Sequence, residues 1–195
     1  GTIKRDLSYL KAVLNHAQRI GWLDRVPFID MPIVNNKRMV FLNDQEVTHL
    51  LDTARDIGPH LTSLLIFLIY TGARLGEALT LEWSQVDFNR EEIVLTSRKG
   101  RKKKLKYRTV PLHAKIIAEL ERVLPEARIG RVFRNSFGKP WALREHNNTG
   151  SPVRKVWERI RNEAGMPHVR IHDLRHTFAS RLRMQGAPLE TIAEL

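Results

Sequence analysis

The chain has 195 residues, 42% of them apolar, and 33 Lys and Arg against 21 Asp and Glu give it a formal net charge of +12. That length and apolar content suffice for one domain, or for one domain and part of another, and exclude a chain that is disordered throughout. The positive charge favours a polyanionic partner, either nucleic acid or an anionic membrane surface, and the lack of cysteine excludes disulfide scaffolds, cysteine nucleophiles and thiolate metal sites.

The start of the chain predicts one helix followed by a linker. Apolar residues recur at helical spacing over residues 3–20, and Gly21 ends the pattern. Residues 27–36 contain two prolines and show no clear period, which is typical of a linker. We therefore expect residues 1–34 to be a separate helical piece, too short for a domain of its own, and residues 35–195 to form the main domain.

The next segment predicts the core of the main domain. Asn43 followed by Glu46 is the signature of a capping box at the start of a helix. Residues 60–70 are apolar on nearly every side, which predicts a core helix. Their longest apolar run, residues 64–69, is far shorter than the roughly 20 residues that cross a bilayer, so no membrane span is expected. A further short helix is expected to start near Arg74.

A basic run follows between two segments with strand character. Residues 92–96 and 107–112 are short and β-prone, so the run between them is expected at the tip of a hairpin. A solvated loop or a localisation-type basic patch is the alternative for such a run. A hairpin tip of this kind would contact a phosphate backbone. Eight of the 33 basic residues lie in the run, with no acid among them: Arg98, Lys99, Arg101, Lys102, Lys103, Lys104, Lys106 and Arg108.

The last third of the chain predicts more helices. Residues 113–124 carry a helical pattern, whereas residues 131–149 are irregular and rich in Asn, Gly and Pro. Ser151 before a proline predicts the start of a helix that runs to Ala164, and residues 174–183 predict another. Pro188 opens a last helix within which the chain stops, so we expect a domain that is incomplete at its C-terminus. The predicted fold class is mainly α with one small antiparallel sheet (α+β).

Two arginines occur where a core does not normally place them. Arg74 follows the most apolar helix, and Glu77 three residues later lies on the same helical face. The two form either a structural ion pair or an arginine positioned by Glu77 to hold an oxyanion. Arg175 lies three residues after His172, where its guanidinium fork can bind two phosphate oxygens while the imidazole moves a proton near neutral pH.

Simpler interpretations of the second pair are a buried structural histidine or an ordinary basic helix face. His172 and His176 have the i, i+4 spacing of a zinc helix, but Asp173 stands where that motif needs Glu, and no third ligand is evident. Two arginines, a histidine and a lysine suffice to stabilise a pentacoordinate phosphate, with no metal and no cofactor. The sequence has neither a carboxylate cluster for metal-dependent cleavage nor a P-loop for nucleotide hydrolysis.

Several of these motifs resemble those of the tyrosine recombinases, the phage integrase family. Residues 71–77, Thr-Gly-Ala-Arg-Leu-Gly-Glu, resemble the first arginine box of that family, and residues 172–180 resemble its His-x-x-Arg box. Residues 108–112 are similar to the strand that closes the family's hairpin, and residues 41–47 to the opening of its catalytic domain. The resemblance implies that residues 1–34 are the last helix of a core-binding domain and its linker.

The resemblance also implies roles for individual residues. Arg74, His172 and Arg175 would be catalytic, and Glu77 would support them. The catalytic lysine would be Lys99, because Lys99 followed by glycine is similar to the start of the family's hairpin turn. The alternatives, Lys103 and Lys104, align if the turn is counted back from Pro111. The DNA-binding residues would be Arg98, Arg101, Lys102, Lys103, Lys104 and Lys106.

The implied function is site-specific DNA recombination or integration by strand cleavage and rejoining through a 3′-phosphotyrosine. In the family a Leu-Gly-His box and the nucleophilic tyrosine follow the helix that starts here near Pro188. Tyr9, Tyr70 and Tyr107 are expected to be structural, so this chain alone is expected to be inactive in cleavage. Because family members exchange C-terminal segments within a tetramer, the resemblance also implies that a chain ending in this helix is monomeric. The parent would act as a tetramer on double-stranded DNA. We expect a cytoplasmic, DNA-associated location, since the N-terminus also lacks a signal peptide.

Two other classes of function compete with this hypothesis. Residues 178–195 can be interpreted as the helix–turn–helix of a non-catalytic DNA-binding protein. The second helix of that motif would carry two acids and no basic residue, which suits a phosphate backbone poorly. An RNA-binding structural protein would use the same basic run, but would leave Arg74 and the pair His172 and Arg175 without a role.

Overall fold

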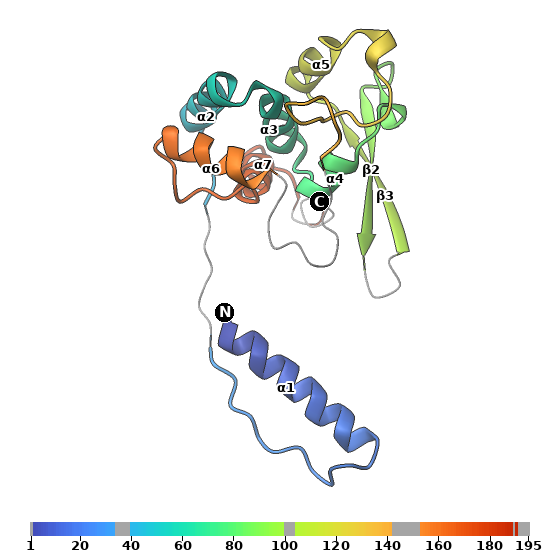
Figure 1. The fold of residues 1–195 in the computed structure, drawn as a ribbon, viewed down its shortest axis with the longest axis vertical. Helices are drawn as coiled ribbons and strands as arrows, with labels where there is room; N and C mark the ends of the chain where they lie inside the picture. Colours follow the sequence, from blue (N-terminus) through green and yellow to red (C-terminus); the bar gives the residue numbers. More distant parts are fainter. Residues whose placement is uncertain (1, 34–39, 100–103, 142–152, 189, 191–195) are drawn as a thin grey trace. The chain divides into compact units, whose positions relative to one another are not determined.

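The computed structural model describes residues 2–33, 40–99, 104–141, 153–188 and 190. Seven helices and a three-stranded antiparallel sheet make up the described part of the chain, which confirms the predicted fold class (Figure 1). The chain divides into two compact units, Gly1–Arg38 and Met39–Leu195, called here the N-terminal unit and the main unit. The predicted domain boundary at residue 34 lies outside the described part, and the assignment of residues 1–34 to a core-binding domain stays a prediction.

The N-terminal unit contains one helix, α1 (Thr2–Arg19), as the apolar spacing predicted. None of its residues is buried, and its apolar side chains, such as Ile3 and Val13, are largely exposed. No helix in the described part of the chain is long and apolar enough to cross a membrane.

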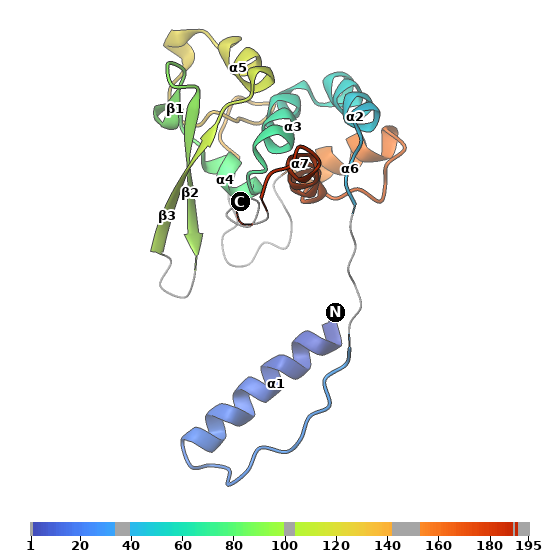
Figure 2. The same cartoon turned by 180° about the vertical axis from the view of Figure 1, so that it is seen from behind.

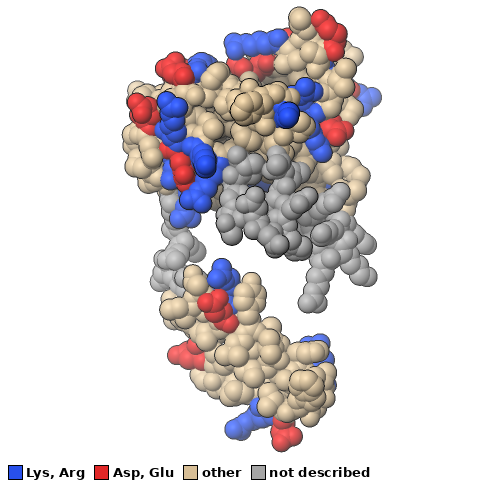
Figure 3. All heavy atoms as spheres, in the orientation of Figure 1, with Lys and Arg blue, Asp and Glu red and all other residues tan. Residues whose placement is uncertain are grey.

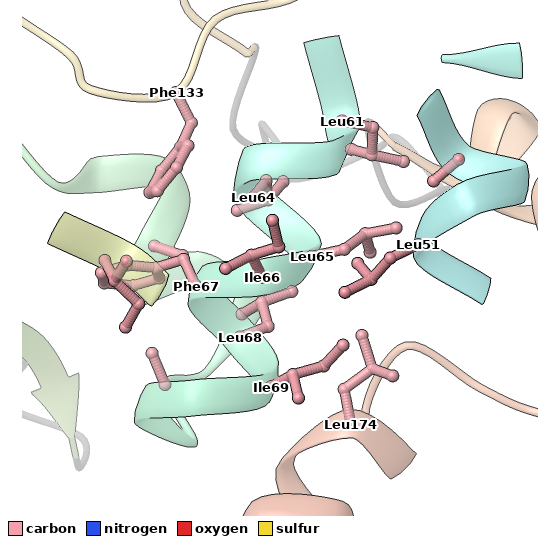
Figure 4. Close-up of a cluster of buried hydrophobic side chains, with 14 of the residues drawn as sticks. Leu51, Leu61, Leu64, Leu65, Ile66, Phe67, Leu68, Ile69, Phe133 and Leu174 are labelled. Carbon is pink, nitrogen blue, oxygen red and sulfur yellow. The ribbon is translucent and has the colours of Figure 1, made fainter. Parts of the chain in front are cut away.

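The main unit is built around α3 (Pro59–Thr71), in which nine residues are buried. Helix α2 (Asp44–Ile57) packs against α3 and begins with the predicted capping box: Asn43 Oδ1 accepts the Glu46 N–H at 2.9 Å, and Glu46 Oε2 accepts the Asn43 N–H at 2.8 Å. Figure 4 shows Leu65 and Ile69 of α3 facing Leu51 of α2 and Leu174. Because α3 is covered on all sides, its apolar residues are not confined to one stripe.

The sheet confirms the predicted hairpin and extends it into the basic run. Strands β1 (Val86–Asp87), β2 (Glu92–Lys99) and β3 (Lys104–Pro111) lie in that order. Ile93 pairs with Val110 and Leu95 with Arg108, while Lys99 and Lys104 form the last pair. In both views of the main unit, α2 and α6 lie on one side of α3, and the sheet and α5 lie on the other (Figures 1 and 2).

The remaining helices are α4 (Leu75–Thr80), α5 (Ala114–Glu121), α6 (Arg154–Glu163) and α7 (Asp173–Met184), with two 3₁₀ turns at Trp83–Gln85 and Pro125–Ala127. The predicted helix over residues 113–124 is too long at its end. Helix α5 ends at Glu121, and Leu124 is 63% exposed with an extended backbone. Pro125 explains the difference, since a proline disfavours helical backbone in the residue before it.

Three further predictions fall wholly or partly outside the described residues. Ser151 and Pro152 lie there, and α6 itself begins at Arg154 with Val153 at the N-cap, later than predicted. Most of the helix expected from Pro188 lies there too, and with it the second helix of the alternative helix–turn–helix. Residues 131–141 form turns and isolated bridges, as expected for that irregular segment.

Candidate active site

The site lies at the end of α3, where the turn at Gly72 meets Phe178 of α7. Gly72 caps α3 with a left-handed backbone, φ 61°, and a Cβ at this position would lie 2.4 Å from the ring of Phe178 on α7. The buried Thr71 hydroxyl donates to the Phe67 carbonyl at 2.6 Å and accepts the Ala73 N–H at 3.2 Å, which fixes the turn on both sides. Only glycine allows this backbone and this approach together, so the turn holds the segment of Arg74 beside α7.

Arg74 stands at the N-cap of α4 and is held there by Glu77. Glu77 Oε2 accepts the backbone N–H of Arg74, and Glu77 Oε1 accepts its guanidinium Nη1, both at 2.9 Å. Half of the Arg74 side chain stays exposed, whereas the Glu77 side chain is 4% exposed. Burial alone would raise the pKa of the Glu77 carboxyl, but hydrogen bonds from the Arg74 backbone and from two guanidiniums outweigh it and hold the pKa below its usual value. Glu77 is therefore a carboxylate that orients Arg74 toward solvent.

The second guanidinium on Glu77 belongs to Arg108, which the sequence placed only within the basic run. Its Nη2 donates to Glu77 Oε2 at 2.9 Å, and its side chain is 21% exposed. A signal for this position exists in the sequence. In strand β3, Arg108 lies two residues before the buried Val110, on the face that a strand of period two turns toward the core.

Arg175 joins this group from α7. Its Nη1 donates to the Gly72 carbonyl, so the turn that ends α3 also anchors the second arginine. Burial, followed by the charges of Arg74 and Arg108, lowers the pKa of the Arg175 guanidinium. We call Arg74, Arg108, Arg175 and Glu77 the arginine platform: Arg74 and Arg108 share the buried carboxylate of Glu77, and Arg175 is hydrogen-bonded to the Gly72 carbonyl beside them. Three positive groups and one carboxylate leave an excess of positive charge for an anion.

His172 lies at the N-terminus of α7, next to the platform. Its partial burial, followed by the charges of His176 and Arg175, lowers the pKa of its imidazole, so the neutral form prevails at neutral pH. The rings of His172 and His176 meet edge to face with centroids 5.1 Å apart. No group of three or more His, Asp or Glu side chains suited to a metal ion occurs in the described part of the chain.

A groove of about 700 Å³ lies beside the platform and is bordered by the hairpin. Arg74 and Glu77 line it from one side, and Thr96, Leu105 and Tyr107 line it from the strands. A second cavity, of about 540 Å³, surrounds Tyr70 and contains none of the predicted site residues. The groove, and not this second cavity, is where an anionic substrate would meet the exposed guanidinium of Arg74.

The basic run itself is only partly described. Lys106 is exposed on β3, and the backbone of Lys99 pairs with that of Lys104. Arg101, Lys102 and Lys103 lie outside the described residues, as do the side chains of Arg98, Lys99 and Lys104. The roles predicted for them stay predictions. On the face of the molecule in Figure 3, Lys and Arg side chains are mixed with Asp and Glu.

The structure thus brings Arg74, Glu77, His172 and Arg175 together from segments about 100 residues apart. A family model described as the phage integrase family matches residues 40–195. The chain belongs to the phage integrase family. The predicted resemblance is confirmed by this match.

The relatives of this phage integrase family member are named as tyrosine recombinases or as integrases. The chain is 28% identical, over all of its length, to a tyrosine recombinase XerC-like protein of Caldanaerobacter subterraneus subsp. tengcongensis. It is 32% identical, over 97% of its length, to the integrase of Salmonella phage P22. The chain spans 58% and 49% of the lengths of these two relatives.

Solved structures of integrases share the fold. The catalytic domain of the bacteriophage HP1 integrase is 27% identical and matches with a TM-score of 0.58 over 80% of this chain and 78% of that one. The Tn1549 transposon integrase in complex with circular intermediate DNA matches with a TM-score of 0.73 over 98% of this chain and 69% of that one, at 18% identity.

Proposed function

We propose that the protein containing this chain performs site-specific recombination of DNA by cutting and rejoining strands through a 3′-phosphotyrosine. The observation that carries the proposal is the arginine platform. Arg74 lines an open groove, and Arg175, from a distant segment, is hydrogen-bonded to the turn just before Arg74. Preorganised positive groups of this kind stabilise the charge that develops on a phosphate in the transition state. Membership of the phage integrase family supports the same reaction class.

Each residue has one task in the proposed reaction. A tyrosine oxygen attacks the scissile phosphorus, forming the 3′-phosphotyrosine bond and breaking the bond to the 5′-oxygen. Arg74 and Arg175 neutralise the non-bridging oxygens, and neutral His172 assists proton transfer by accepting the proton that the tyrosine hydroxyl loses. Lys99, or else Lys103 or Lys104, gives the departing 5′-oxygen its proton. The 5′-hydroxyl of a partner strand then reverses these steps, so the bond energy is kept without ATP.

None of the chain's three tyrosines is proposed as the nucleophile. Tyr9 belongs to the N-terminal unit, and Tyr70 packs against His113 and accepts a hydrogen bond from Lys115 at 2.9 Å. Tyr107 is 66% exposed and lines the groove with Arg74, which makes it the tyrosine that an experiment must exclude. We propose that a part of the protein outside this chain supplies the nucleophile.

The proposed partner is double-stranded DNA in the cytoplasm. Similar folds occur in a Tn1549 integrase bound to circular intermediate DNA and in a XerH recombinase bound to its difH substrate. We further propose a tetramer on DNA for the full-length protein and a monomer for this chain by itself. Stable tetramers of the chain in sedimentation without DNA would contradict the second statement.

Covalent trapping tests the proposed reaction. The DNA site is first selected by the full-length protein from a library of random duplexes, and a nicked duplex carrying that site then traps the protein–DNA link on a denaturing gel. We expect an adduct from the full-length protein and none from this chain. Specific binding without any adduct would favour the alternative, a non-catalytic DNA-binding protein. An adduct of this chain that disappears in Tyr107→Phe would overturn the assignment of the nucleophile.

A further inference from the structure

We propose that Arg108 is a positioning residue, which fixes the β2–β3 hairpin to the segment that presents Arg74 by sharing the carboxylate of Glu77. The inference rests on the proposed function for its effect on catalysis, but its structural part is independent of the reaction.

The hydrogen bonds of Glu77 show how two separate elements meet on one side chain. Oε1 accepts the guanidinium of Arg74, and Oε2 accepts both the Arg74 backbone N–H and Nη2 of Arg108, each at 2.9 Å. The residue as a whole is 5% exposed, so water cannot easily replace a missing donor. Removing Arg108 leaves Oε2 with one donor and frees strand β3 from α4.

The burial of Arg108 separates it from a DNA-contacting residue. Its Nη2 is bonded to Glu77, its Nε is buried without a hydrogen-bond partner within the described part of the chain, and its side chain is 21% exposed. Arg74, by contrast, is half exposed on the same carboxylate. Arg108 is therefore placed to hold Glu77, and Arg74 is the guanidinium of this pair that faces solvent.

The position of Arg108 in the hairpin explains what it can hold. Its register partner Leu95 is buried, but the next pair on that face joins Ser97 to the exposed Lys106. Arg108 thus stands where the hairpin leaves the core. Lys99 follows Leu95 by four residues, or about 13 Å of strand. A small rotation of the hairpin about the Leu95–Arg108 pair therefore moves the backbone of Lys99 farther than it moves the backbone of that pair.

A different contact holds the neighbouring strand. Gln85 donates to the Val94 carbonyl at 2.7 Å and to the Thr96 hydroxyl at 3.0 Å, so β2 is tied to the 3₁₀ turn and not to Arg74. Among the described residues, the side-chain bond from Arg108 connects β3 to Glu77. Strand β2 also packs directly on α4, so the hairpin should stay folded without Arg108, and the part beyond the Leu95–Arg108 pair should lose its fixed direction relative to α4.

The test compares Arg108→Gln and Arg108→Lys with the control Arg90→Gln. Arg90 lies in the turn between β1 and β2 and pairs with Asp87 at 3.8 Å in an exposed position. The chain has no cysteine, so Gln45→Cys on α2 and Leu105→Cys on β3 accept one pair of nitroxide labels whose distance distribution reports the placement of the hairpin. Single-turnover cleavage of the selected nicked duplex by the full-length protein is measured in parallel without labels.

We expect Arg108→Gln to broaden or shift the distance distribution and to slow cleavage by about 100-fold, as a displacement of about 1 Å can do, with DNA affinity nearly unchanged. Arg108→Lys should restore part of both, since an ammonium can still reach one oxygen of Glu77. Arg90→Gln should change neither.

An unchanged distance distribution in a folded Arg108→Gln variant would overturn the proposal, and so would a changed distribution with an unchanged cleavage rate. If Arg108→Gln does not fold, Arg108→Lys decides by the same two measurements. If the wild type forms no adduct, the proposed function fails. The distance distribution then decides the placement of the hairpin by itself.

Discussion

The arginine platform and the basic run of the hairpin contain the same kinds of side chain and use them differently. In the platform, Glu77 and the Gly72 carbonyl hold Arg74, Arg108 and Arg175 in fixed directions. In the run, Lys106 is exposed and forms no ion pair with another described residue. Charges held in fixed directions can stabilise one particular phosphate group. Exposed charges attract the nucleic-acid backbone as a whole, in proportion to their number, and are screened by salt. Arg108 belongs to the basic run in the sequence but to the platform in the fold.

The largest effect is expected from removing a platform arginine. Arg175→Ala should lower the single-turnover cleavage rate of the full-length protein by about 10²–10³-fold, because it removes a donor aimed at the developing charge, while DNA affinity changes far less. Arg183→Ala, on the last turn of the same helix, is the matched control. Equal losses of cleavage rate in the two variants would show that the position of the arginine does not matter, and would remove the distinction between the arginine platform and the basic run.

The turn that assembles the platform can be tested through stability. Gly72→Ala should lower the free energy of unfolding by about 2–3 kcal/mol, because both the left-handed backbone and the contact with Phe178 oppose a methyl group. Gly186→Ala shares the positive φ but meets no atom within 4 Å, so it should cost only about 1 kcal/mol. Urea denaturation measures both. Equal losses would mean that the approach of α7 to the turn is not tight.

The basic run is tested by the salt dependence of binding. Changing Lys102, Lys103 and Lys104 together to Ala should weaken DNA binding for all sequences and reduce the slope of log K against log salt by about 0.9 for each phosphate that these side chains neutralise. The cleavage rate at saturating DNA should change little if Lys99 is the catalytic lysine. Loss of cleavage at saturation would point to Lys103 or Lys104 instead. An unchanged slope would show that the run does not contact phosphate.

The smallest expected effect is a shift in the titration of His172. Burial and the neighbouring charges lower its pKa, so the folded chain binds this proton less readily than the unfolded chain. The resulting contribution to stability is present above the ordinary histidine pKa of about 6.5 and is lost as the pH falls through the folded value. NMR titration should give a midpoint below about 6.5, and Arg175→Ala should raise it. A midpoint at or above that of an unfolded peptide would contradict this picture.

Local signals predict those parts of the fold that depend on neighbours in the sequence. The capping box of Asn43 and Glu46 and the two strands of the hairpin are of this kind, because each is specified by residues a few positions apart. The predicted end of α5 is wrong: the helix ends at Glu121, and Pro125 accounts for the extended backbone of Leu124. The i, i+3 spacing predicted the pairing of Arg74 with Glu77, but Arg74 stands at the extended N-cap of α4, so the contact has the geometry of a capping box and not of one helical face.

The sequence by itself determined the kind of protein: the two arginine boxes, their order and the hairpin between them are enough to identify a member of the phage integrase family. Only the tertiary structure decided which arginines share one carboxylate. Arg108 lies 31 residues from Glu77 and Arg175 lies 103 residues from Gly72, and no local period relates such positions. They meet because α7 packs on α3 and the strands turn one face toward the core, so their partners follow from burial and not from spacing.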